Sequence, residues 1–152
     1  MAYEAFAVVT NEAKQRTGEM WAYGTSFQVK YFGVTDGGHD PADATTALAV
    51  DPSAIVMPGA PAFFTDPITS ITWYNDLCPT FVCTIHKGDI IGGMSSIGLI
   101  AEIVYAGVVP RPAGSPVVPL VGYQFLYAVY NRPQLLLTAT DGPTVFELTP
   151  FM

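Results

Sequence analysis

The chain has 152 residues, half of them hydrophobic and 12% charged, and thirteen acidic against six basic side chains give a net charge of −7. A single domain of this length, 1–152, can bury a core without disulfides or a metal. The basic residues form no cluster that could bind nucleic-acid phosphates. The longest apolar run, 97–109, is interrupted by Glu102 and is too short to span a membrane. We therefore expect neither nucleic acid nor membrane as a partner.

The first predicted element is a helix over 10–23. Thr10 or Asn11 can cap its start, and Gly24 is a natural stop after its last turn. The period then changes to two, because apolar and polar residues alternate over 27–31, as in a half-buried strand.

Two proline- and glycine-rich segments, 34–67 and 107–122, are predicted to be extended loops. The first is long enough to be an arm that becomes ordered against neighbouring proteins. Strand patterns cover the rest of the chain, and Asp141-Gly142 is predicted to be the hairpin turn between the last two strands. The predicted strands lie at 68–74, 80–86, 97–105, 120–130, 135–138 and 144–148.

These elements predict a mainly β fold: an antiparallel β-sandwich with one N-terminal α-helix and two long Pro/Gly-rich loops. Gly37 and Gly38 end the strand before the first loop, and we expect them to provide a positive φ at a turn. The same role in turn geometry is assigned to Gly92 and Gly93.

The loop that follows Gly38 gathers Asp36, His39, Asp40 and Asp43. Carboxylates and imidazole could bind a metal or a sugar. The spacing matches no EF-hand, however, and aspartates in such a segment commonly bond their own backbone. A turn is therefore the preferred interpretation.

Cys78, Cys83 and His86 offer only three zinc ligands, and a structural zinc site takes four. Ser95 and Ser96 do not lie in a nucleophile elbow, and neither histidine has a neighbour in sequence that marks it as a base. We expect no metal, no cofactor and no enzymatic activity.

Aromatic residues alternate along the strand at 120–130 in a way that places them on both faces. One face can pack in the core while the other contacts a second subunit. The candidate interface residues are Tyr123, Phe125, Tyr127 and Tyr130.

Five short segments, taken in order, resemble those of the phage tail-collar fibre family. They are 10–14 (that family's "TNAG"), 34–38 ("VGDGG"), 46–48 ("TxL"), 92–99 ("GG…IGL") and 128–133 ("AxxNxP"). The resemblance covers about two thirds of the chain. Thr35 stands where that family usually has glycine, and Ser96 stands where it commonly has an acidic residue.

The resemblance implies a virion structural protein of the phage tail, assembled in the host cytoplasm. It would be an adaptor that links tail fibre to baseplate, a homo-oligomer and by resemblance a trimer, with other tail, baseplate and fibre proteins as partners. The alternative is a small carbohydrate-binding, lectin-like module that uses exposed aromatic rings and the loop from Asp36 to Asp43.

Overall fold

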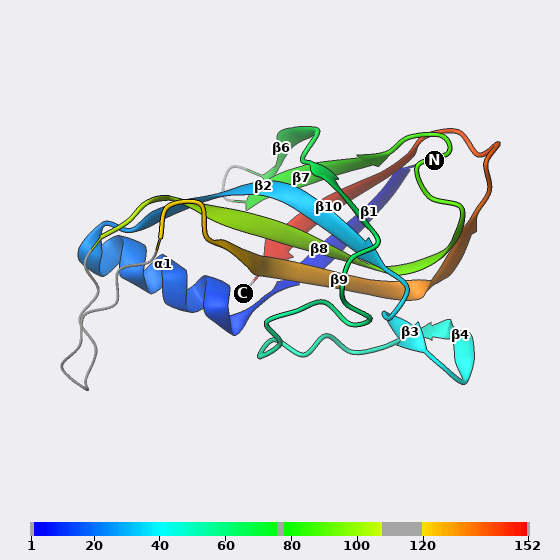
Figure 1. Ribbon diagram of the computed structural model, residues 1–152, viewed down its shortest axis with the longest axis horizontal. Helices are drawn as coiled ribbons and strands as arrows, with labels where there is room; N and C mark the ends of the chain where they lie inside the picture. Colours follow the sequence, from blue (N-terminus) through cyan, green and yellow to red (C-terminus); the bar gives the residue numbers. More distant parts are fainter. Residues whose placement is uncertain (1, 76–77, 108–119, 152) are drawn as a thin grey trace.

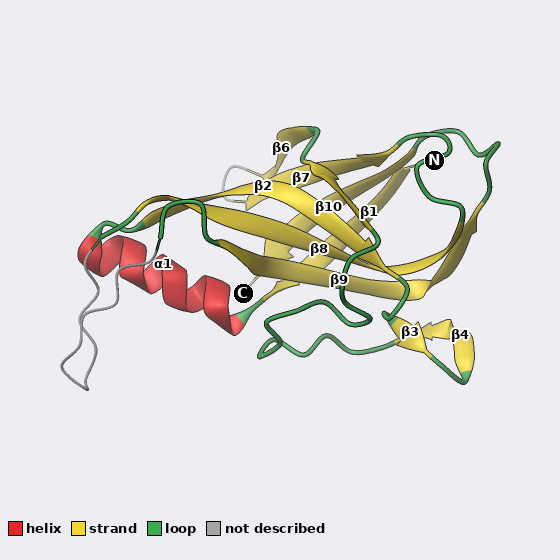
Figure 2. Ribbon diagram, in the orientation of Figure 1, coloured by secondary structure: helices red, strands yellow, loops and turns green. Residues whose placement is uncertain are grey.

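The computed structural model describes residues 2–75, 78–107 and 120–151. Within these ranges the chain forms one helix and ten strands (Figures 1 and 2). In chain order they are β1 (Ala2–Val9), α1 (Asn11–Tyr23), β2 (Ser26–Thr35), β3 (His39–Asp40), β4 (Asp43–Ala47), β5 (Phe64–Pro67), β6 (Ser70–Asn75), β7 (Cys78–Ile85), β8 (Gly92–Tyr105), β9 (Gln124–Leu137) and β10 (Thr144–Phe151).

Eight of the strands form one curled sheet in the order β5-β2-β8-β9-β1-β10-β7-β6, and β3 pairs only with β4. The sheet is mixed, because β1 runs parallel to β10 while its other neighbour, β9, is antiparallel. The predicted antiparallel sandwich is therefore wrong: the mainly β class is confirmed, but the architecture is a half-barrel made of a single sheet.

The strand that changes the topology is β1, which the sequence analysis did not predict. It lies between β9 and β10, so the last two strands are not neighbours and the predicted hairpin at Asp141-Gly142 is wrong. Asp141 instead closes a local turn, in which its carboxylate accepts a hydrogen bond from the Thr138 N–H at 2.5 Å.

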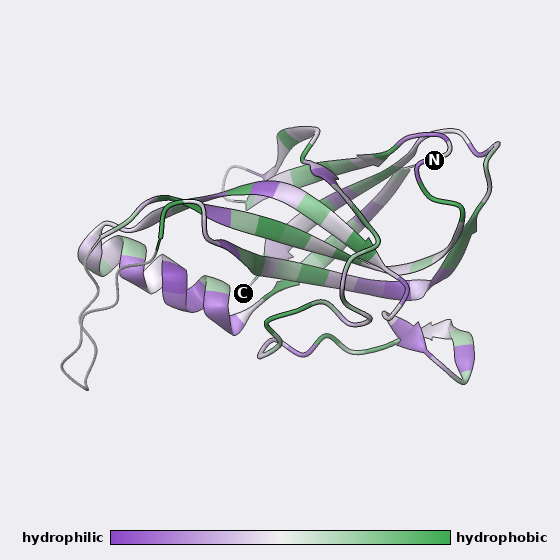
Figure 3. Ribbon diagram, viewed as in Figure 1, coloured by the Kyte–Doolittle hydropathy of each residue, from purple (hydrophilic) through white to green (hydrophobic). Residues whose placement is uncertain are grey.

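The core lies on the inner face of the curled sheet. Along β10, Phe146 and Leu148 are buried while Glu147 between them points outward, as the period of a strand requires. Figure 3 shows the same alternation of hydrophobic and hydrophilic residues along several strands. The largest fully buried side chains are Phe32, Phe146, Met94, Ile97, Leu99, Ile103 and Leu148.

The helix is confirmed, together with both of its ends. Thr10 is the N-cap, and its hydroxyl accepts from the Ala13 N–H at 3.2 Å and donates to the Leu126 carbonyl at 2.7 Å. Gly24 ends the helix with φ +78°, a left-handed conformation that glycine adopts at little cost. The cap therefore also attaches the helix to β9.

The segment 34–67 is more ordered than a single loop. The strand β2 continues to Thr35, β3 and β4 form a hairpin, and β5 pairs with β2. The remaining stretch, 48–63, packs against the sheet through the buried side chain of Met57.

The second predicted loop, 107–122, lies largely outside the described residues, which include only Gly107 and 120–122 of it. The strand β9 is one continuous element where two were expected. It continues through Pro133 because the ladder is irregular there: Asn131 pairs with Ser96, and Leu135 pairs with Met94. Such an irregularity tolerates a residue without an N–H. Among the described residues, α1 is far too short and too polar to cross a bilayer.

Candidate functional site

Residues from four of the five segments that resemble the tail-collar family meet at one place, where β2 ends and the β3–β4 hairpin begins. The Gly38 N–H donates to the Ser95 hydroxyl at 2.8 Å, and the Gly38 carbonyl accepts from the Leu48 N–H at 2.8 Å. The Asn131 amide then donates to the Leu48 carbonyl at 3.2 Å. We call this set the junction; it comprises Asp36, Gly38, His39, Leu48, Ser95, Asn131 and Gln134.

A second connection in the junction joins Asp36 to β9. The Gln134 side-chain amide donates to the Asp36 carboxylate at 2.7 Å. A Cβ at Gly93 would collide with the Gln134 amide and would lie 2.7 Å from the Asp36 carboxylate. The glycine at 93 is therefore required by a close approach of side chains.

Gly37 and Gly38 were predicted to provide a positive φ, and this prediction is wrong. Neither glycine has a positive φ. A Cβ at Gly37 would lie 2.5 Å from the Pro58 carbonyl carbon, and one at Gly38 would overlap the Ser95 carbonyl oxygen. Both positions need glycine because another segment of backbone passes against them. Of the four predicted turn glycines, Gly92 has the positive φ, +122°.

The "IGL" portion of the chain has a comparable packing explanation. Ile97 and Leu99 point into the core, while Gly98 lies opposite Gly33 on the outer face of the sheet. A Cβ at Gly98 would be 2.7 Å from the Met57 sulfur. Gly33 and Gly98 thus leave a shallow depression in which the Met57 side chain packs. This contact attaches the 48–63 stretch to β2, β8 and β9.

Folding brings Asp36, His39 and Ser95 together, which the sequence analysis did not foresee. The His39 Nδ1 lies 2.8 Å from the Ser95 hydroxyl and 3.4 Å from the Asp36 carboxylate. A catalytic triad needs these two contacts on different ring nitrogens, and here one nitrogen makes both. Ser95 is also fully buried. The arrangement therefore secures the hairpin and does not prepare a nucleophile.

The other acidic residues of this loop are used locally. Asp43 accepts hydrogen bonds from the Thr45 and Thr46 hydroxyls and from the Thr45 N–H, which lower the pKa of its carboxyl group. Asp40 accepts from the Ala42 N–H. The preferred interpretation of these two aspartates as turn residues agrees with these contacts.

Cys78 is half-buried, and Cys83 is buried at the centre of β7, where burial raises the pKa of its thiol well above the usual range. No group of three or more potential metal ligands occurs in the described parts of the chain. His86 follows β7 in a turn closed by Asp89, whose carboxylate accepts from the His86 N–H.

The four predicted interface residues on β9 are mostly occupied within the chain. Phe125 is only 4% exposed and packs edge-on against Phe27, which excludes it from a subunit interface. Tyr127 and Tyr130 are half-buried against the core, and burial raises the pKa of the Tyr127 hydroxyl. Tyr123 remains well exposed and donates to Glu12 at 2.9 Å.

The prediction failed at Phe125 because both faces of β9 are covered by the chain itself. One face meets the core. The other face meets Met57, which packs on Leu126 and Val129.

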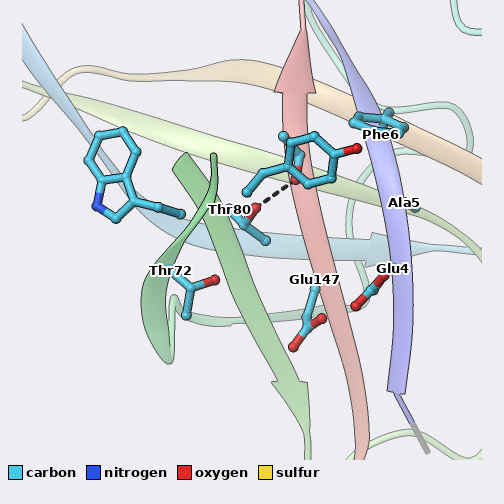
Figure 4. A pocket seen from close by; sticks show the side chains of 9 residues that line it. Glu4, Ala5, Phe6, Thr72, Thr80 and Glu147 are labelled. Atoms are coloured by element: carbon cyan, nitrogen blue, oxygen red, sulfur yellow. Dashed lines mark hydrogen bonds between the residues drawn. The ribbon is translucent and has the colours of Figure 1, made fainter. Parts of the chain in front are cut away.

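A second candidate site is a groove on the outer face of the other half of the sheet, with a volume of about 420 Å³. Phe6, Trp73 and Tyr74 line it and are all more than half exposed. Glu4 and Glu147 lie side by side at its rim (Figure 4). At its base, the hydroxyls of Thr80 and Thr149 are hydrogen bonded at 2.7 Å.

Sequence reasoning missed the partners of the junction and the whole groove. Ser95, Asn131 and Gln134 lie 56 to 98 residues in the sequence from the groups that they bind. The groove depends on the pairing of β1 with β10, which no local pattern specifies.

Comparisons with protein-family models, with curated proteins and with solved structures each returned no match.

Proposed function

We propose that this protein is a non-enzymatic structural component of a bacteriophage tail, an adaptor between fibre and baseplate. The observation that carries the proposal is the convergence of the quoted segments. Four of the five segments each contribute one residue to a single hydrogen-bonded junction. These residues are Gly38, Leu48, Ser95 and Asn131. Because these short motifs build one junction of the fold, they would be expected to occur together in a protein with this structural role.

The contacts in the junction also favour a structural role over a chemical one. Its hydroxyl and amide groups bind backbone and side chains of the same chain, and Ser95 is inaccessible to a substrate. The result is that the β3–β4 hairpin is held beside β9, with the residues of β4 exposed (Figure 1).

The surface supports association with other proteins. Eighteen large hydrophobic side chains are exposed among the described residues, and only 12% of the chain is charged. Exposed apolar residues mark a site of protein contact where they lie together in one patch. Several of these residues lie around the end of β8: Val104 and Tyr105 are its last two residues, and the Tyr123 carbonyl accepts from the Ile103 N–H. Tyr23, the last residue of α1, is also exposed.

In this proposal the chain works as a homo-oligomer in the virion tail, assembled in the host cytoplasm. The trimeric state rests on the resemblance to the tail-collar family. The subunit contact moves from the middle of β9 to this tyrosine-rich end, where Tyr105 and Tyr123 replace the buried Phe125.

Measurement of molar mass by light scattering, together with binding to the fibre and baseplate proteins encoded beside this chain, tests the proposal. We expect an oligomer that Tyr105→Lys dissociates without loss of β-structure. Ile91→Lys is the matched control, because Ile91 is equally exposed but lies in the turn between β7 and β8. A monomer at high concentration that binds none of these proteins would overturn the proposal.

The carbohydrate-binding alternative loses the loop on which it partly relied, because Asp36 and Asp43 are engaged in internal hydrogen bonds. Its remaining support is the aromatic groove. A glycan array distinguishes the two functions, since an adaptor should bind no glycan there.

A further inference from the structure

The groove lies on a bare part of the sheet. Met57 and α1 pack against β2, β8 and β9, whereas no described helix or loop covers the outer face of β1, β10, β7 and β6. On that face the Phe6 ring meets Tyr74 edge-on, with centroids 5.4 Å apart, and both rings are more than half exposed. The two rings form an aromatic wall that is open to solvent, and Trp73 lies next to Tyr74 on β6.

Two carboxylates of like charge are fixed beside this wall. Glu4 on β1 and Glu147 on β10 are directly paired in the parallel register and point out of the same face. Within the described residues, neither carboxylate has a hydrogen bond or an ion pair. Like charges directly opposite on neighbouring strands repel, so a cation placed between them would relieve that repulsion.

The strand next to the groove is a sheet edge that no described segment covers. The two edges of the sheet are β5 and β6. The strand β5 has four residues and ends in Asp66-Pro67, which are features that prevent further strand pairing. The strand β6, Ser-Ile-Thr-Trp-Tyr-Asn, has no charge and no proline, and all six of its residues are exposed. Such an edge can pair with a strand from another chain.

We propose that β6 and the groove form a docking site for an extended segment of another protein. The segment adds to the edge of β6 as a strand. One of its arginine or lysine side chains enters the groove, between the aromatic wall and the carboxylates of Glu4 and Glu147. Attraction between a cation and an aromatic face, together with the ion pair, selects the basic side chain.

Within the described residues, no basic side chain of a second copy is placed to fill this role. Three of the described basic residues are already engaged: Arg16 with Glu12 and Glu19, Lys30 with Glu102, and Arg132 over the Tyr3 ring. The exposed Lys14 and Lys87 lie in α1 and in a turn, so neither belongs to an extended segment that could add to an edge.

A sugar ring could stack on Trp73, but it would leave the repulsion between the two carboxylates in place. The observations therefore favour a cationic partner segment. This docking site lies on a different part of the sheet from the junction. The proposal of a docking site is therefore independent of the proposal that the protein belongs to a phage tail.

The test uses the full chain and three synthetic peptides that differ at one position: acetyl-Thr-Val-Thr-X-Thr-Val-Thr-amide with X as arginine, citrulline or glutamate. Citrulline keeps the shape of arginine and removes its charge. Titrations followed by NMR should show the arginine peptide shifting the amide signals of β6 and the Trp73 indole signal. We expect binding about tenfold tighter than for the citrulline peptide and weaker in high salt.

Two variants locate the effect. The double substitution Glu4→Gln with Glu147→Gln should remove the preference for arginine, while Asp66→Asn, at the opposite sheet edge, should keep it. Thr72→Lys should also block the arginine peptide, because Thr72 lines the groove and a lysine there can neutralise the two carboxylates.

Equal binding of the arginine and citrulline peptides would overturn the proposal, as would the absence of any change in the β6 signals. Shifts of the groove signals by maltohexaose or chitohexaose but not by the arginine peptide would show that the groove is a glycan site.

Discussion

The junction and the groove are opposites in how they use polar groups. In the junction, Ser95 is completely buried and is bonded to Gly38 and His39 of another segment. In the groove, Glu4 and Glu147 face solvent with no partner among the described residues. A buried hydrogen-bonded group specifies one arrangement of the chain, whereas an exposed unpaired group leaves its interaction to another molecule.

The junction and the groove also differ in the size of the side chains around their polar groups. Glycines in the junction remove side chains so that two stretches of backbone can touch, as Gly37 does against Pro58. The groove instead exposes two large rings, Phe6 and Tyr74, at positions where small polar side chains would make the surface more soluble. The comparison indicates that the first region holds this chain together and that the second is available for association.

The largest expected effect is at Gly38. A Cβ there overlaps the Ser95 carbonyl oxygen, and the backbone of Ser95 is held in strand β8. Gly38→Val should therefore cost about 3 kcal/mol or more of the free energy of unfolding. Gly142→Val is the control, since nothing lies within 4 Å of its Cβ position. Urea denaturation of both variants checks the prediction, and equal midpoints would contradict it.

The next effect is at Tyr127, one of the four residues first assigned to a subunit interface. Its ring packs against the core and against Phe27, with centroids 5.8 Å apart. Tyr127→Lys should therefore destabilise the fold by about 2 to 3 kcal/mol. The matched control is Leu136→Lys, because Leu136 lies on the same strand and is 68% exposed. If Tyr127→Lys changes oligomeric state and leaves the melting temperature unchanged, the structural assignment fails.

Removal of a single hydroxyl at Ser95 should have a smaller effect. Ser95→Ala leaves the buried Gly38 N–H without its acceptor, which should cost about 2 kcal/mol. Ser70→Ala, on the exposed edge strand, should change stability by less than about 0.5 kcal/mol. Thermal unfolding of the pair measures the difference between a buried and an exposed serine, and similar losses would show that the junction is not the stabilising region.

These contrasts explain how much of the molecule the sequence could predict. Local patterns specified α1, because the cap at Thr10 and the stop at Gly24 are signals within a few residues of the helix. They also identified most strands and the unusual glycines. They gave the wrong reason for Gly37, because the backbone that it contacts is about twenty residues away.

The architecture could not be predicted because it depends on β1. The N-terminal strand inserts between β9 and β10, and its pairing spans nearly the whole chain. No turn residue or other local sequence signal predicts pairing between strands so far apart in the sequence. The groove follows from it, since Glu4 and Glu147 are neighbours only in the parallel register of β1 with β10. The sequence consequently predicted most of the secondary-structure elements, but it did not predict the groove that these elements form together.

The smallest expected effect has the opposite sign from the others. Glu4 and Glu147 repel across the β1–β10 pair, so Glu4→Gln should stabilise the chain by a few tenths of a kcal/mol, about 0.3. Added salt should reduce the gain, because it screens exposed charges. The two substitutions should not be additive: once Glu4 is neutral, Glu147→Gln has no repulsion left to relieve.

Glu102 supplies the matched control, because it is a strand carboxylate that does have a partner. Its oxygen lies 2.6 Å from the Lys30 Nζ, and the hydrogen bond from Lys30 lowers the pKa of the Glu102 carboxyl group. Glu102→Gln should therefore destabilise the chain slightly, the reverse of Glu4→Gln. Thermal unfolding at low and high salt compares the two. A loss of stability in Glu4→Gln would mean that this carboxylate already has an attractive partner, and the groove would then lack the unbalanced charge that favours a basic ligand.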